Sequence, residues 1–169
     1  GNVLLTRRES PTAPPNYFLR DLAANSETAL TEYTDPAPLL RNVTKRLLTY
    51  EREDGVQLSA ILYLPHEYDE ATPLPLLMWA YPREFTSTTA ASEVRGSPYR
   101  FTTTRGASHL LLLTQGYAIL DGPAMPIIGE GETANNSYVE QLVLGAKAAI
   151  ETVVDMGITQ NDRIAIGGH

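Results

Sequence analysis

The last stretch of the chain, "RIAIGGH" at residues 163–169, has the residue types most suggestive of chemistry. A short apolar run, Ile164 to Ile166, breaks into two glycines and a histidine. This pattern is typical of the nucleophile elbow, G-x-S-x-G, in which a serine occupies a strained strand-to-helix turn. Gly168 would be the first glycine, His169 the variable residue, and the serine the residue after it. We therefore expect the chain to stop just before a nucleophile.

The preceding segments predict the elements that would position such an elbow. They are a hairpin over 45–64 with a two-residue turn at Asp54-Gly55, an apolar strand over 76–80, a helix ending near Gly116, a strand over 117–120, a helix over 138–156 and a strand over 163–166. The two stretches 83–106 and 122–137 are expected to be loops. Because helices and strands alternate, the sequence predicts an α/β domain with a mainly parallel sheet and flanking helices.

The helix over 138–156 has the clearest local signals. Ser137 and Glu140 match the S-x-x-E capping box, in which each side chain binds a free backbone donor. Gly157 is placed to end the helix. An apolar stripe should face the sheet: Val139, Leu142, Val143, Ala146, Ile150, Val153 and Val154.

Residues 1–43 differ from the rest of the chain in that they predict only short strands and turns. "NVLLTRRE", "YFLRDL" and "TALTEYTD" (28–35) read as short strands, and the proline-containing "DPAPLLRN" marks a boundary near residue 43. Three short strands cannot bury a core alone. We expect them to belong to a larger all-β body.

Composition excludes several classes of protein. The chain has 169 residues, 43% of them hydrophobic, with a net charge of −7 and no cysteine. A nucleic-acid binder would need a basic surface, and a disulfide framework or thiolate metal site would need cysteine. The longest aliphatic run, Leu110 to Leu113, is too short to span a bilayer. The G-x-G-x-x-G pattern of a dinucleotide-binding domain is also missing after the strands. We expect no cofactor, metal, nucleic acid or membrane partner.

Six stretches along the whole chain carry a family resemblance: "ESPTAPPNYFLRDL", "LLMWAYPREF", "VRGSP", "AILDGPAMPIIGEGE", "YVEQL" and "DRIAIGGH". The sequence resembles the prolyl oligopeptidase family of serine peptidases, and within it the glutamyl endopeptidases of the plant chloroplast type and their bacterial relatives. The resemblance implies that residues 1–43 are the end of a β-propeller and its linker. Residues 44–169 would then be the first part of an α/β-hydrolase domain.

The resemblance also implies a Ser-His-Asp triad, in which serine attacks a peptide carbonyl. In α/β-hydrolases the triad follows the order Ser, Asp, His, so all three residues would lie after residue 169 and the chain alone should be inactive. One oxyanion-hole donor in this family is a tyrosine hydroxyl after the third strand, and Tyr81 in "MWAYP" has that place. Pro82-Arg83-Glu84 replaces the glycine-rich text that often follows this tyrosine.

Three arginines are candidates for contact with the substrate. A preference for Glu or Asp before the cleaved bond would need a cationic pocket, because a carboxylate is held best by arginine. Arg83, Arg95 and Arg105 lie on segments expected to rim the site, and Arg83 and Arg95 are the candidate substrate-binding residues. Glu130 and Glu132 are expected to brace a loop.

The histidines are expected to be structural or exposed. His109 begins the helix that ends near Gly116, His66 follows a strand, and His169 neighbours the expected serine. None of the three has metal-ligand spacing.

Other functions remain open on this sequence. They are an acylaminoacyl- or dipeptidyl-peptidase of the same family, an esterase, and a hydrolase-like binding module that has lost its serine. The compartment is open between bacterial cytoplasm, periplasm and plastid stroma, as is the oligomeric state.

Overall fold

The structure, a computed structural model, describes residues 1–168 except for the side chain of Glu132. The chain divides into two compact units. One consists of residues 1–41 and 98–108, and the other holds the rest of the described chain. The predicted boundary near residue 43 therefore falls close to the first crossing between the units, but the excursion of 98–108 was not foreseen.

The first unit contains a small antiparallel sheet in the order β1-β2-β3, formed by β1 (Val3–Arg8), β2 (Asn16–Asp21) and β3 (Ser26–Ala29), and a 3-10 helix η1 (Pro38–Leu40). The first two strands agree with the sequence prediction. The third begins before residue 28, because Asp21 Oδ1 accepts hydrogen bonds from the N–H groups of Ala23 and Ala24 and folds a tight turn. Val3, Leu4 and Leu5 are 46–65% exposed, so this sheet has no core of its own.

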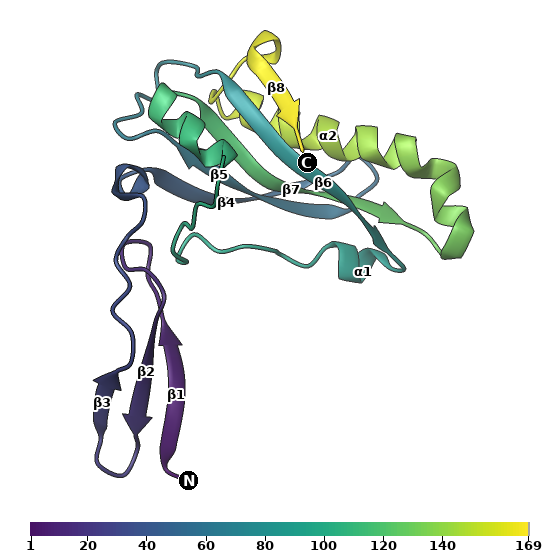
Figure 1. The fold of residues 1–169 in the computed structure, drawn as a ribbon. Coiled ribbons are helices and arrows are strands. Elements are labelled where there is room, and N and C mark those ends of the chain that lie inside the picture. The colour runs from purple at the N-terminus through teal and green to yellow at the C-terminus, as the bar shows by residue number, and fades with distance from the viewer. Residues whose placement is uncertain (169) are drawn as a thin grey trace. The chain divides into compact units, whose positions relative to one another are not determined.

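The second unit is built on a five-stranded sheet in the order β4-β5-β7-β6-β8 (Figure 1). Its strands are β4 (Thr44–Glu51), β5 (Gln57–Leu64), β6 (Leu76–Phe85), β7 (Ala118–Ile128) and β8 (Ile164–Gly167). β4, β5 and β7 pair antiparallel, whereas β7, β6 and β8 pair parallel. In the described residues the sheet is thus mixed, and the prediction of a mainly parallel sheet was wrong, because the hairpin contributes two antiparallel pairings.

The helices of this unit are short except for one. They are α1 (Thr88–Ala91), α2 (Tyr138–Asp155) and the 3-10 helices η2 (His109–Gln115), η3 (Gly131–Ser137) and η4 (Asn161–Arg163). The helix predicted to end near Gly116 is the 3-10 segment η2, and Gly116 follows it with a φ of 80°. None of the helices in the described residues is long and apolar enough to cross a membrane.

The β4–β5 hairpin has the predicted position but a longer loop. Arg52 N–H donates to Val56 O, and Gly55 N–H donates to Arg52 O, so the loop has three residues. Gly55 has a φ of 86°, the left-handed conformation that such a loop requires at its last position. Glycine tolerates this conformation because it has no Cβ.

β6 and β7 extend well beyond the strands predicted from sequence. β8 pairs with β6 only as far as Trp79, and β5 pairs with β7 only as far as Asp121. Beyond these residues β6 and β7 continue as a two-stranded ribbon with open outer edges (Figure 1). An open edge tolerates proline, which cannot donate a backbone hydrogen bond. Pro126 therefore lies within a strand where the sequence predicted a loop, and Pro82 lies within β6 although the predicted strand ended at residue 80.

α2 packs along one face of the sheet and differs from its prediction in two ways. The Ser137 side chain forms no cap bond but accepts a hydrogen bond from Gln141 Nε2, because η3 runs directly into α2 and leaves no free helix start there. Val139 and Val143, part of the predicted stripe, are 71% and 58% exposed. The predicted end at Gly157 is present, with a φ of 73°.

The face of α2 that is buried has small residues at its centre. A Cβ on Gly145 would lie 3.7 Å from Met125 Cα, so helix and sheet approach closely there. The residues of α2 that are buried are Gln141, Gly145, Ala148, Ala149 and Val153. They cover a core made by β4, β5, β6 and β7, which includes Leu58, Leu62, Leu76, Met78 and Leu120.

Candidate active site

β6 presents two chemically different faces. Side chains alternate along a strand, so Met78, Ala80 and Pro82 face the α2 side. The opposite face carries Trp79, Tyr81, Arg83 and Phe85. The aromatic residues of this strand and its one arginine are thus brought to one face, whereas Glu84 falls on the other by the same alternation.

A β-bulge opens this face where β6 leaves the main sheet. Trp79 pairs with Asp121, but Tyr81 pairs with Ala124, so β7 has one residue more than β6 between these pairs. Gly122 lies in the extra segment with a φ of 56°. Bulges of this kind redirect side chains and are frequent next to active sites. Here the bulge begins the wall of a pocket.

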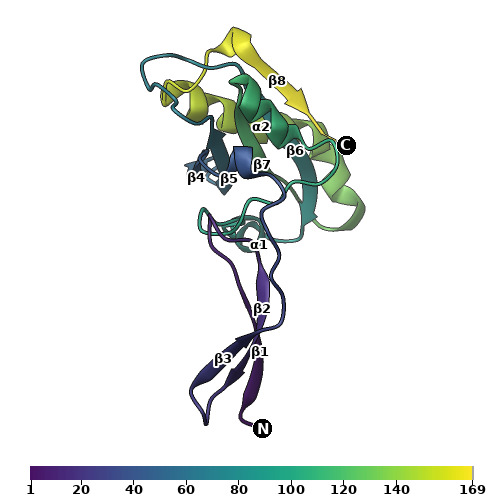
Figure 2. The same cartoon turned by 60° about the vertical axis from the view of Figure 1, so that its left-hand side comes forward.

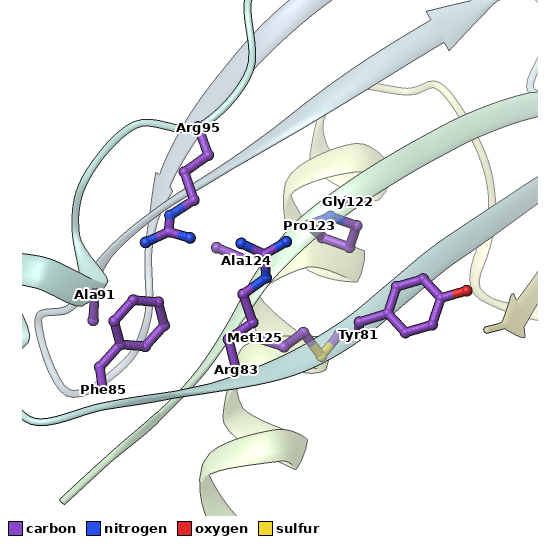
Figure 3. Close-up of a pocket in the computed structure, with 9 residues that line it drawn as sticks. All are labelled: Tyr81, Arg83, Phe85, Ala91, Arg95, Gly122, Pro123, Ala124 and Met125. Atoms are coloured by element: carbon purple, nitrogen blue, oxygen red, sulfur yellow. The ribbon is translucent and has the colours of Figure 1, made fainter. Parts of the chain in front are cut away.

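The arginine pocket has a volume of about 150 Å³ (Figure 3). It is lined by Tyr81, Arg83, Phe85, Ala91, Arg95, Gly122, Pro123, Ala124 and Met125. The Arg95 guanidinium carbon lies 5.0 Å from the centre of the Phe85 ring, and Arg95 N–H donates to Ser59 Oγ at 3.3 Å. Among the side chains that the structure describes, neither Arg83 nor Arg95 forms an ion pair. Two exposed cations therefore line one pocket, and neither is paired with a carboxylate that the structure describes.

Tyr81 lies at the edge of this pocket and faces away from the arginines. It is 42% exposed, and its hydroxyl points to the opposite side from the two guanidinium groups in Figure 3. A Cβ on Gly168 would lie 3.8 Å from Tyr81 Cε1 and 2.9 Å from Ala80 O. The tyrosine ring is thus beside the end of β8, where the sequence predicts the elbow. Both views show the C-terminal end of β8 next to β6 (Figures 1 and 2).

The end of β8 also packs tightly against Trp79. A Cβ on Gly167 would lie 2.8 Å from an atom of the Trp79 ring. The backbone of β8 can approach β6 this closely only because Gly167 has no side chain. Gly167 at the end of β8 and Gly168, the first glycine of the predicted elbow, are therefore both required by contacts with β6.

One cluster was not recognised in the sequence. His109 Nε2 lies 2.8 Å from Asp121 Oδ1, and the imidazole is stacked on the Trp79 indole with 4.7 Å between ring centres and an interplanar angle of 11°. Trp79 and Tyr81 meet edge to face at 6.4 Å. A pairing of Trp79 with Asp121 across β6 and β7 could have suggested this cluster, but their register is not visible in the sequence.

The other face of β6 borders an apolar groove of about 480 Å³ between β6, β8 and α2. Its lining residues are Met78, Ala80, Pro82, Met125, Leu142, Val143, Ala146, Ile166, Gly167 and Gly168. Its lining offers no polar side chain, so the chemistry of this part of the fold lies on the arginine side of β6.

The remaining candidates lie elsewhere or are not described. Arg105 belongs to the first unit. Glu130 precedes η3 as its N-terminal cap residue, and the predicted brace at Glu132 and the predicted elbow residue His169 fall outside the described side chains. Within the described residues no group of three or more metal-binding side chains is close enough to hold an ion.

Comparison with known proteins places this geometry in a family context. No protein-family model matches the chain. The chain is 48% identical to a probable chloroplastic glutamyl endopeptidase of Oryza sativa subsp. japonica and 47% identical to one of Arabidopsis thaliana, in each case over 169 residues and 98% of this chain. The resemblance to the prolyl oligopeptidase family is confirmed. The chain spans only 18% of the length of these two relatives.

Solved structures agree with the family at the level of the fold. A prolyl endopeptidase superimposes with a TM-score of 0.63 and 15% identity, covering 99% of this chain and 23% of that chain. Oligopeptidase B from Leishmania major gives 0.61 and 16%, covering 99% of this chain and 22% of that one. A putative dipeptidyl aminopeptidase IV from Bacteroides ovatus gives 0.67 and 16%, covering 99% and 24%.

Proposed function

We propose that this chain is a segment of a serine peptidase of the prolyl oligopeptidase family that cleaves peptide bonds after acidic residues. In this proposal residues 1–43 end a β-propeller, residues 44–169 begin the α/β-hydrolase domain, and the serine, aspartate and histidine of the triad follow in the whole protein. The observation that carries the proposal is that Tyr81 lies beside Gly168 and at the edge of the arginine pocket.

Tyr81 would act as a donor to the oxyanion. Attack of serine on the peptide carbonyl places negative charge on its oxygen, and a positioned O–H group stabilises that charge. The ring stands 3.8 Å from a Cβ built on Gly168, so a serine shortly after this glycine would meet its substrate near the tyrosine. Tyr81 is exposed and its hydroxyl is turned away from the arginines, so it would donate to the substrate on that side.

Arg83 and Arg95 would bind the acidic side chain that precedes the cleaved bond. Arg83 lies two residues beyond Tyr81 on the same face of β6, about 7 Å along the strand. The arginine pocket therefore adjoins Tyr81, although the Tyr81 hydroxyl itself points away from the two guanidinium groups. Two guanidinium groups that have no carboxylate partner among the described side chains would favour an anion there. The names of the curated relatives, glutamyl endopeptidases, agree with this choice of substrate.

The first experiment is fluorophosphonate labelling of the whole protein, followed by intact mass measurement. The proposal predicts a single covalent adduct and a mass well above the 18.5 kDa of this chain. Absence of an adduct on the folded whole protein would refute a serine hydrolase and favour a binding module.

Specificity is tested with matched peptides that differ only in having Glu, Gln or Pro before the cleaved bond. We expect Glu to be preferred, and we expect Arg83→Gln and Arg95→Gln to reduce the ratio of Glu to Gln cleavage by about tenfold or more. Arg46→Gln is the matched control, because Arg46 is a partly exposed arginine on β4 that pairs with Glu70. Equal Glu and Gln cleavage by the unmodified protein would refute acidic specificity, and a preference for Pro would favour a prolyl peptidase.

A further inference from the structure

We infer that His109 is a positioning residue that holds the oxyanion-hole tyrosine and the end of β8 in place through Trp79. This inference rests on the proposed function, because it assigns a role in that reaction to a histidine and a carboxylate outside the expected triad. Sequence reasoning treated His109 as structural, and the geometry of its contacts gives it a more specific task.

The imidazole of His109 is fixed by two contacts of different kinds. Its Nε2 is 2.8 Å from Asp121 Oδ1, and both side chains are partly buried, with 18% and 31% of their surface exposed. An ionised carboxylate can only accept a hydrogen bond, so the Nε2–H of His109 donates to Asp121. The ring plane is then set by the stack on Trp79, 4.7 Å away and nearly parallel.

Trp79 connects His109 to two parts of the proposed site, the end of β8 and Tyr81. A Cβ on Gly167, opposite Trp79 in the β6–β8 ladder, would lie 2.8 Å from the indole. The indole also meets the Tyr81 ring edge to face, at 78°. The Trp79 indole therefore packs against the His109 imidazole, the backbone of β8 and the Tyr81 ring. A substitution at His109 would shift the indole and, through it, both β8 and Tyr81.

The β-bulge explains why Tyr81 needs support from side-chain contacts. β7 gains its extra residue directly after Asp121, so the pairing between β6 and β7 is irregular between Trp79 and Tyr81. The ladder hydrogen bonds are disrupted at a bulge and hold the Tyr81 backbone less well there. The bond between His109 and Asp121 joins η2 to β7 just before the irregular stretch, and the stack joins η2 to β6.

The inference predicts a selective effect on the chemical step. Displacement of a catalytic group by about 1 Å can reduce rate a hundredfold, whereas substrate binding in the arginine pocket is separate from the indole. We expect His109→Ala to lower kcat of the whole protein on a Glu-containing peptide by about tenfold, with little change in KM. His66→Ala is the matched control, because His66 is an exposed histidine on the same unit, and it should leave kcat unchanged.

The decisive measurement is a double-mutant cycle with Tyr81→Phe. Loss of an oxyanion-hole donor should lower kcat by about 100-fold or more. If His109 acts through Tyr81, His109→Ala should have little further effect in the Tyr81→Phe protein, because residues that act as one unit are not additive. A tenfold loss in both backgrounds would overturn the action of His109 through Tyr81, and a rise in KM at constant kcat would overturn the inference as a whole.

Two further variants keep the test valid if His109→Ala folds poorly. His109→Phe retains an aromatic ring against Trp79 but loses the bond to Asp121, and Asp121→Asn retains an oxygen that can accept from His109. We expect Asp121→Asn to keep nearly full kcat and His109→Phe to be intermediate. Full activity of His109→Phe would overturn the role of the hydrogen bond. If Tyr81→Phe itself is fully active, the oxyanion proposal fails, which is a different outcome from additivity with His109.

Discussion

The buried guanidinium of Arg52 predicts an unequal response to removal of the two partners of one ion pair. Arg52 Nε and Nη2 each donate to a carboxylate oxygen of Asp54 at 2.7 Å. The Arg52 side chain is 1% exposed, whereas that of Asp54 is 44% exposed. Arg52 Nη1 also donates to Pro126 O at 3.0 Å, and Nη2 lies 3.4 Å from Gln141 Oε1. The hairpin loop is thereby tied to β7 and α2.

Asp54→Asn should be the more damaging change. It leaves a buried guanidinium without an anion, and an uncompensated buried charge costs about 3–5 kcal/mol of unfolding free energy. Since Asn keeps one acceptor oxygen, we expect about 3 kcal/mol. Arg52→Met leaves a carboxylate that water can reach, and its main cost is the donor lost by the buried Pro126 carbonyl, about 1–2 kcal/mol.

Urea unfolding of the whole protein at pH 7 checks this order, with midpoints compared at equal slope. The double variant Arg52→Met/Asp54→Asn should be more stable than Asp54→Asn alone, because no buried charge remains. The reasoning is refuted if Arg52→Met destabilises the protein more than Asp54→Asn does.

The same pair predicts a dependence on pH. Hydrogen bonding to Arg52 is the main cause that lowers the pKa of Asp54, so the folded state favours the carboxylate. The resulting stabilisation is present above the unfolded pKa of about 4 and is lost as pH falls through the lower folded pKa. The stability difference between the unmodified protein and Arg52→Met should therefore persist from pH 7 to 5 and shrink below pH 4.

Three further predictions concern packing. Tyr50→Phe should raise stability by up to about 1 kcal/mol in urea unfolding, because the buried Tyr50 hydroxyl has no hydrogen-bond partner among the described residues; a loss of more than 1 kcal/mol would mean that the hydroxyl is bonded. Gly167→Ala should lower stability by about 1–3 kcal/mol, since the new methyl group would meet Trp79; unchanged thermal unfolding would contradict that contact. Arg41→Ala should speed proteolysis within residues 98–108, because Arg41 stacks on Phe101 at 3.9 Å, and equal cleavage rates would argue against this tie.

The sequence predicted local features well where one signal dominated. Asp54-Gly55 marked the hairpin and Gly157 the end of α2, because few residues other than glycine adopt these conformations. Predictions from the sequence failed where the local structure depends on contacts with residues far along the chain. The predicted strand ended at residue 80, before Pro82, but β6 continues through Pro82 as part of the ribbon that it forms with β7.

The residues of the candidate site likewise divide into those that local sequence could predict and those that it could not. Tyr81 and Arg83 could be proposed from residue type and family resemblance, because they follow a buried strand on one local segment. The pairing of His109 with Asp121 could not, since it depends on where η2 docks on the sheet and on a bulge that no local pattern announced. Ser137 was assigned a capping role that η3 makes unnecessary.

The composition of the first unit has a consequence for dissecting the protein. Residues 98–108 cluster with residues 1–41, and Phe101 N–H donates to Glu9 Oε2 at 3.1 Å. The polypeptide therefore passes between the units three times, near residues 41, 97 and 108. A gene fragment that begins at residue 42 would carry the excursion without its partners and expose Phe101, which is 6% exposed in the intact chain. Recombination between relatives at residue 42 alone would combine residues 1–41 of one protein with residues 98–108 of another. Exchange of the first unit therefore requires residues 1–41 and 98–108 to be exchanged together.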